Sequence, residues 1–149
     1  MSELDELYQE IIMDHNRKPR NFRRIDEANH TADGFNPFCG DEVKLFLMIE
    51  DETVKDASFQ GSGCAISRAS VSMMTDAVKG KTVAEVEQLF DLFQGLLTNR
   101  EDETTNTSSL GDLEVLAGVS EFPTRVKCAT LSWHTLKGAL RGDERVSTE

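Results

Sequence analysis

The stretch EVKLFLMIEDETVKDASFQ, residues 42–60, decides the fold. Apolar residues occupy every second position of its first half, namely Val43, Leu45, Leu47 and Ile49. This alternation is typical of a strand with one strongly apolar face. Asp51 and Glu52 then predict a turn, and residues 53–60 predict a strand that returns beside the first as a hairpin.

The chain before this hairpin begins with a predicted amphipathic helix. Its apolar residues recur at helical spacing, at Leu4, Leu7, Tyr8, Ile11 and Ile12. Residues 13–37 have no clear period and contain two prolines and a glycine. We expect this segment to be mostly loop, with room for a short strand.

Two helices are predicted after the hairpin. The first begins after Cys64, carries apolar residues on two sides and ends at Gly80. The second begins at Thr82, where the sequence TVAE matches a capping box closed by Glu85. Its apolar face consists of Val86, Leu89, Phe90, Phe93 and Leu97.

The last part of the chain predicts an exposed loop and a final helix. Residues 98–109, TNREDETTNTSS, are polar throughout, and a short apolar segment follows at 110–119. Thr124 is a possible cap of the last helix, which ends before Gly142. The predicted buried stripe of this helix is Val126, Ala129, Trp133, Leu136 and Leu140. This order of elements indicates one α+β domain, with helices packed on an antiparallel sheet.

Length and charge limit the classes of function. The chain has 149 residues, the size of one ordinary domain, and a formal net charge of -11. Such an acidic protein is a poor partner for nucleic acid, whose phosphates require clustered Lys and Arg. One basic stretch, RKPRNFRR at residues 17–24, is interpreted either as a solvated loop or as a surface that docks an acidic partner protein.

The sequence predicts a cytoplasmic protein. The first ten residues, MSELDELYQE, lack the basic start and apolar core of a signal peptide, and no apolar run is long enough to cross a bilayer. In that compartment three cysteines are not expected to form structural disulfides. Metal binding, catalysis and simple burial remain as explanations for the three thiols.

All three cysteines lie at the ends of predicted elements. Cys39 and Asp41 precede the long strand, with Gly40 between them to let the backbone turn. Cys64 opens a helix, where the helix dipole favours a thiolate, and Cys128 lies in the predicted first turn of the last helix. Three thiolates and one carboxylate would complete a tetrahedral zinc site. Unrelated buried thiols remain the alternative, because the chain has no CxxC pair.

The histidines are not predicted to be ligands. His134 follows Cys128 by six residues, a spacing that places it on another face of a helix. We interpret it as a structural or surface residue. His15 is expected at the end of the first helix.

Five motifs together resemble the U-type iron–sulfur cluster assembly proteins, the family that includes IscU and SufU. In chain order they are LYQEIIMDH (7–15), KPRN (18–21), NPFCGD (36–41), GSGCAIS (61–67) and RVKCATLSW (125–133). The resemblance covers nearly the whole chain. It implies a single α+β domain over residues 1–149, with a three-stranded antiparallel sheet. It also implies that Cys39, Asp41, Cys64 and Cys128 converge on one metal ion.

Two features place the resemblance nearer the SufU branch. That branch carries an insertion between its second and third cysteines, which here would span about residues 92–118. Scaffolds of the IscU branch carry a histidine immediately before their third cysteine, whereas this chain has Lys127.

The resemblance therefore implies a zinc-dependent sulfur acceptor. It would take persulfide sulfur from a SufS-type cysteine desulfurase and pass it toward a downstream cluster-assembly scaffold, without nucleic acid or membrane. Cys39 would accept the sulfur, and Arg125 would orient the freed thiol or help dock the partner. The alternatives are a scaffold that builds a [2Fe–2S] cluster on the same ligands, and an interaction module that zinc only stabilises. Whether such a sulfurtransferase-like acceptor counts as an enzyme in its own right is left open.

Overall fold

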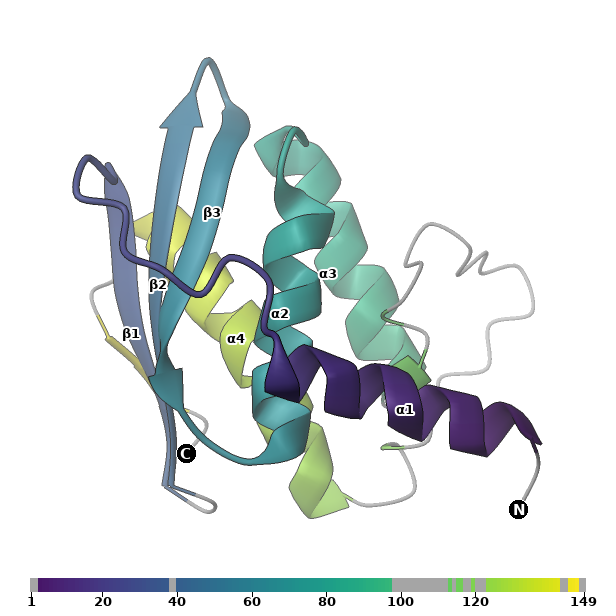
Figure 1. The fold of residues 1–149 in the computed structure, drawn as a ribbon. Coiled ribbons are helices and arrows are strands. Elements are labelled where there is room, and N and C mark those ends of the chain that lie inside the picture. Colours follow the sequence, from purple (N-terminus) through teal and green to yellow (C-terminus); the bar gives the residue numbers. More distant parts are fainter. Residues whose placement is uncertain are drawn as a thin grey trace.

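The computed structural model describes residues 3–37, 40–97, 113, 115–116, 119, 123–142 and 145–147. These residues form four helices and four strands in an α+β arrangement (Figure 1). In chain order the elements are α1 (Glu3–Arg17), β1 (His30–Asn36), β2 (Asp41–Glu50), β3 (Thr53–Ser62), α2 (Ala65–Val78), α3 (Val83–Leu97), α4 (Pro123–Arg141) and β4 (Arg145–Ser147).

The β2–β3 hairpin is the predicted one. Asp51 and Glu52 form its turn with positive φ angles of 52° and 61°, and β2 pairs antiparallel with β3 over nearly its full length. Val43, Leu45 and Leu47 are buried, as the alternation predicts. Phe46 is buried as well, although it points to the opposite face. The segment that joins α1 to β1 crosses that face of the sheet (Figure 1).

The predicted three-stranded antiparallel sheet is wrong in strand number and in direction. The sheet has four strands in the order β3-β2-β1-β4, and β4 pairs parallel to β1. β4 has only three residues, RVS, so it is too short to produce a period in the sequence. β1 contains small and polar residues, HTADGFN, which is why the sequence indicated mostly loop there. Backbone pairing with β2 makes this segment a strand.

The helices lie in two layers on one face of the sheet. α2 and α4 contact the strands directly, and α3 packs on α4 farther from the sheet (Figure 1). The indole of Trp133 is fully buried in α4, with its ring centroid 5.0 Å from that of Phe93 on α3. Aromatic pairs at this distance add to the energy of area burial. The predicted core face of α3 is confirmed in all five residues.

The start of α3 is capped as the sequence predicts. The amide nitrogen of Glu85 donates to Oγ1 of Thr82 at 3.2 Å, and the amide nitrogen of Thr82 donates to Oε1 of Glu85 at 3.0 Å. This reciprocal pair is a capping box. The N–H donation holds the pKa of the Glu85 carboxyl below its ordinary value.

α4 begins two residues earlier than a cap at Thr124 predicts, and it is buried on more than one side. Pro123 is its first residue, a position that proline favours because its fixed φ suits the helix. The expected cap, Thr124, therefore lies inside the helix. Ala129, Trp133 and Leu136 are buried as predicted, while the two ends of that stripe, Val126 and Leu140, are only half-buried. Cys128 and Leu131, on other sides of α4, are fully buried.

The basic stretch at residues 17–24 is partly neutralised within the chain. Arg20 pairs with Asp14 at 3.4 Å, Arg23 with Asp56 at 2.6 Å and Arg24 with Asp26 at 3.0 Å. These pairs support the interpretation of a solvated segment tied to its own domain. The Arg23 hydrogen bond also holds the pKa of Asp56 below its ordinary value.

Several predicted features fall on residues that the structure does not describe. The polar loop at 98–109 lies wholly outside the described residues, and so does Cys39. Most of the expected insertion at 92–118 lies outside them too. Within it, Leu113, Val115 and Leu116 are described and buried in the core, and so is Val119 just beyond it.

No helix among the described residues is both long enough and apolar enough to cross a membrane.

Candidate metal centre

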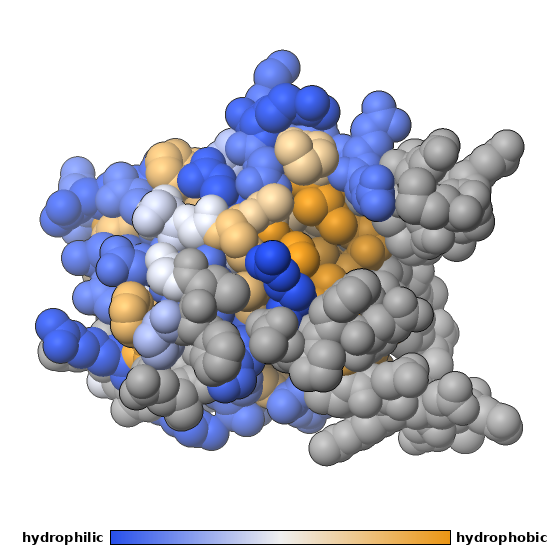
Figure 2. Space-filling view, turned by 90° about the horizontal axis from the view of Figure 1, so that it is seen from below, coloured by the Kyte–Doolittle hydropathy of each residue, from blue (hydrophilic) through white to orange (hydrophobic). Residues whose placement is uncertain are grey.

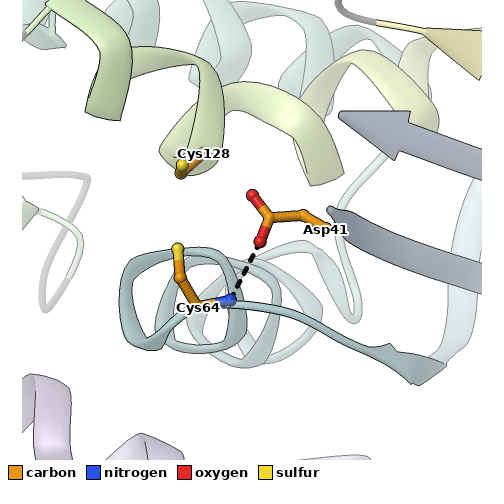
Figure 3. A group of neighbouring side chains, drawn as sticks. All are labelled: Asp41, Cys64 and Cys128. Atoms are coloured by element: carbon orange, nitrogen blue, oxygen red, sulfur yellow. Dashed lines mark hydrogen bonds between the residues drawn. The ribbon is translucent and has the colours of Figure 1, made fainter. Parts of the chain in front are cut away.

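Three of the four predicted ligands meet at one end of the sheet. A carboxylate oxygen of Asp41 and the sulfur atoms of Cys64 and Cys128 all lie within 4.8 Å of one another (Figure 3). Asp41 and Cys128 are fully buried, and Cys64 is half-buried. The three residues come from the start of β2, the N-terminus of α2 and the second turn of α4. A cluster assembled from such distant segments is built by the fold and not by local sequence.

Asp41 is directed into this cluster by the register of β2. It precedes Val43 by two positions, so the strand places both side chains on the face that the helices cover. One of its oxygens, Oδ1, accepts a hydrogen bond from the amide nitrogen of Cys64 at 2.9 Å (Figure 3). This contact satisfies one of the unpaired N–H groups at the start of α2. The positive end of the helix dipole also favours the carboxylate there.

Gly63 allows this close approach. A Cβ atom added at Gly63 would lie 2.7 Å from Oδ1 of Asp41, which is shorter than real Cβ contacts. Gly40, on the other side of the aspartate, has a φ of 68°, a conformation that side chains rarely adopt. The glycines of the NPFCGD and GSGCAIS motifs therefore have separate tasks: one turns the chain and one makes room for the carboxylate.

A fourth residue at the cluster, Asn36, was not predicted. Its side chain is fully buried, and its Nδ2 donates to Oδ2 of Asp41 at 3.1 Å. The same nitrogen lies 3.6 Å from the sulfur of Cys128, within hydrogen-bonding distance for sulfur. Asn36 stands in the NPFCGD motif, two residues after Gly34 on the inward face of β1. The weak period of β1 gave no sign of which way this side chain would point.

The remaining predicted site residues can be placed only in part. Cys39 lies in the connection between β1 and β2, outside the described residues. Arg125 is exposed in the first turn of α4, three residues before Cys128, so both belong to the same side of that helix. Lys127 is half-buried next to Cys128.

The histidines lie away from this cluster. The ring of His134 packs edge-on against Phe90 with centroids 5.4 Å apart, in agreement with a structural role. Burial, assisted by the charge of Lys137, lowers the pKa of His134 below its ordinary value. His15 is buried at the end of α1, where its Nδ1 lies 2.7 Å from the hydroxyl of Ser72.

The surface around the cluster is partly apolar. Figure 2, the view from below Figure 1, shows an area of hydrophobic residues bordered by hydrophilic ones. Ile66 and Val126, each two residues from one of the cysteines, are half-buried apolar residues packed against the core. Partly exposed apolar side chains therefore lie close in sequence to two of the three candidate ligands.

The donor set suits a soft or borderline metal ion. Two thiol sulfurs and one carboxylate oxygen are ligands that zinc accepts in tetrahedral sites, and thiolates also bind iron–sulfur clusters. Zinc–sulfur bonds of about 2.3 Å place tetrahedral ligand atoms about 3.8 Å apart. The observed limit of 4.8 Å is about 1 Å longer, so small side-chain rotations would close the three donors on one ion.

Comparison with known proteins agrees with this geometry. The family model described as the NifU-like N-terminal domain matches residues 7–129. The chain is 42% identical over 141 residues to the zinc-dependent sulfurtransferase SufU of Bacillus subtilis, covering 95% of this chain and 94% of that protein. It is 39% identical to the iron–sulfur cluster assembly scaffold protein IscU of Streptococcus pyogenes, covering 95% and 87% of the two chains.

A solved structure has the same fold. It is a scaffold protein for the SUF system from Fervidobacterium islandicum, 33% identical, with a TM-score of 0.83 over 91% of this chain and 97% of that one. β4 lies beyond the residues that the family model matches. The matched segment includes all four predicted ligands, and the chain belongs to the NifU-like N-terminal domain family, that of the IscU- and SufU-like iron–sulfur cluster assembly proteins.

Proposed function

We propose that this protein is a zinc-dependent sulfur acceptor that receives persulfide sulfur from a SufS-type cysteine desulfurase. It would then relay the sulfur to a downstream scaffold for cluster assembly. One observation carries the proposal: the ligand atoms of Asp41, Cys64 and Cys128 lie within 4.8 Å of one another. The likeness to the Bacillus subtilis sulfurtransferase supports it.

Cys39 is the proposed fourth ligand and the sulfur acceptor. Asn36 and Asp41 face each other across β1 and β2, so only four residues, 37–40, connect them. Pro37 and Gly40, the first and last residues of this connection, are both exposed. Cys128 is fully buried and Cys64 half-buried, and this burial disfavours both as the thiol that meets a partner's persulfide.

The transfer step exchanges one sulfur–sulfur bond for another. The thiolate of Cys39 attacks the outer sulfur of the desulfurase persulfide, a new S–S bond forms at Cys39, and the old one breaks. The desulfurase cysteine leaves as a thiolate, so no external oxidant or reductant is needed. Zinc, when bound, keeps the ligand thiols deprotonated. Cys39 would act as the nucleophile when it is free of the metal, and Asp41, Cys64 and Cys128 would hold the ion.

Arg125 is the proposed docking or orienting residue. Its exposed guanidinium lies on the side of α4 that also carries Cys128. A guanidinium is suited to paired hydrogen bonds with a carboxylate, so it would recognise an acidic group on the desulfurase.

Two other functions remain in competition. The Streptococcus pyogenes relative is named as a scaffold, and the same four residues would hold a [2Fe–2S] cluster. Lys127, in the place where IscU scaffolds carry histidine, favours the sulfur acceptor. In the third case zinc would only stabilise the fold. An aspartate ligand argues against it, because purely structural zinc sites usually consist of cysteine and histidine.

The deciding experiment measures cysteine turnover by the desulfurase with and without the zinc-loaded protein. We expect the zinc form to accelerate turnover and Cys39→Ala to abolish the effect, with the persulfide mapped to Cys39 by mass spectrometry. Ser58→Ala, a buried change on the far side of the sheet, serves as the control that should accelerate normally. A persulfide at normal yield on another cysteine would contradict the assignment of Cys39. Stimulation or a cluster chromophore only after exchange of zinc for iron would support the scaffold.

A further inference from the structure

Asn36 lies where β1 ends and β2 begins. It is the last residue of β1 and is paired directly with Asp41, the first residue of β2. Opposed residues of antiparallel strands point to the same face, so both side chains enter the cluster. Both are fully buried. A buried amide at this position must satisfy its polar atoms within the protein.

The side-chain nitrogen of Asn36, Nδ2, donates hydrogen bonds to two candidate ligands. It lies 3.1 Å from Oδ2 of Asp41 and 3.6 Å from the sulfur of Cys128. The atom beside a carboxylate oxygen has to be the nitrogen, because two acceptor oxygens would repel. An NH₂ group has two hydrogens, and these match the two acceptors.

These contacts divide the ligands into two groups. The carboxylate of Asp41 is held on both oxygens, by the Cys64 amide on Oδ1 and by Asn36 on Oδ2. Cys128 is fully buried and receives the second Asn36 hydrogen. Cys64 is only half-buried. Asp41 and Cys128 are therefore the most restrained of the described ligands.

We propose that Asn36 is a positioning residue that makes Asp41 and Cys128 the fixed pair of metal ligands. It holds both side chains in place before the metal binds and would limit their movement once the metal is bound. This inference rests on the proposed metal site and adds a residue to it.

The expected loss of metal affinity without Asn36 can be estimated from other residues that hydrogen-bond to metal ligands. Groups that orient metal ligands through hydrogen bonds change metal affinity about 10- to 100-fold when they are removed. A hydrogen bond to a thiolate also lowers the energy of the sulfur lone pairs. Its loss should therefore shift the sulfur-to-cobalt charge-transfer band of the Co²⁺ form to longer wavelength.

The test compares Asn36→Leu with the wild-type chain. Leucine has the same number of side-chain heavy atoms and the same branching as asparagine but donates no hydrogen bond, which separates the role of the amide from that of side-chain shape. We expect zinc affinity, measured by chelator competition, to fall about 10- to 100-fold. Zinc release to excess chelator should be faster, and the cobalt charge-transfer band should move to longer wavelength.

Asn29→Leu is the matched control. Asn29 bonds the backbone of Ile49 at the other end of β2, through its Nδ2 at 2.6 Å and its Oδ1 at 2.9 Å. This variant should lose stability while it keeps the zinc affinity and the cobalt spectrum of the wild type. If Asn36→Leu fails to fold, Asn36→Ser keeps one donor and should give an intermediate affinity and release rate.

Wild-type affinity, release rate and cobalt spectrum in the folded Asn36 variants would overturn the inference. Such a result would leave the proposed function intact, because sulfur acceptance by the wild-type chain is measured separately. Conversely, wild-type protein that binds zinc but accepts no sulfur would contradict the proposed function alone. The Asn36 comparison needs no desulfurase.

Discussion

The imidazole of His15 and the hydroxyl of Ser72 lie 2.7 Å apart and join α1 to α2 in a buried contact. The backbone amide of Arg20 donates to the same hydroxyl, also at 2.7 Å. One serine on α2 thus fixes both the end of α1 and the chain that leaves it. His15, which the sequence places only at the end of the first helix, is therefore part of a buried polar contact between two helices.

Ser72→Ala should lower the free energy of unfolding by about 1–3 kcal/mol, because the buried imidazole of His15 and the partly buried backbone amide of Arg20 lose this partner. Chemical denaturation of the metal-free chain would measure the change. The matched control is Ser58→Ala. The hydroxyl of Ser58 is equally buried and has no hydrogen-bond partner among the described residues. Its removal should be neutral or stabilising, and equal losses in both variants would contradict the importance of the His15 contact.

Gly63→Ala should weaken zinc binding about tenfold or more, because the new methyl group would press on Oδ1 of Asp41. Chelator competition measures the effect. Gly95→Ala provides the comparison, since nothing lies within 4 Å of a Cβ at that position inside α3. That variant should keep the zinc affinity and gain up to about 1 kcal/mol of stability from helix propensity. Unchanged zinc affinity in Gly63→Ala would show that the carboxylate tolerates displacement.

His134 should make stability depend on pH. Its pKa in the folded protein lies below the ordinary value of 6.5, so the unfolded chain binds the proton more readily. Stability is therefore highest above pH 6.5 and falls as the pH decreases from there toward the folded pKa. We expect His134→Gln to remove this part of the loss when Tm is followed from about pH 7 to pH 5.

His30→Gln is the control variant, because it removes a different histidine, the one at the start of β1. The decisive quantity is the difference in Tm between variant and wild type at each pH, because every other titrating group contributes equally to both. A difference that stays constant across the range would contradict the assignment to His134.

The sequence predicted most of the fold wherever apolar residues carry a period. The alternation at Val43, Leu45 and Leu47 gave the hairpin, and the capping box at Thr82 gave the start of α3. The sequence indicated mostly loop at β1 and gave no sign of β4. Each is stabilised mainly by backbone pairing, β1 with β2 and β4 with β1, and not by a pattern of its own side chains. Short strands of small and polar residues leave no periodic signal.

The convergence of three of the candidate ligands was predictable from the sequence, but the contacts that support them were not. The motifs pointed to Asp41, Cys64 and Cys128, and the structure brings these three together. Asn36 belongs to the NPFCGD motif, but nothing in the sequence indicates its role. Its role depends on which face of β1 it occupies, and only the strand register decides that.

The pairing of Asn36 with Asp41 has a consequence for how this protein can change. The candidate ligand Asp41 and the core residue Val43 are two positions apart on β2, so their side chains point to the same face of the sheet. One residue inserted between them would turn the carboxylate outward while the apolar residues stayed in place. A two-residue insertion would restore its direction but move it along the strand by about 7 Å. Near Asp41, an insertion that leaves the carboxylate in the cluster must therefore fall before β2, in the connection between Asn36 and Asp41.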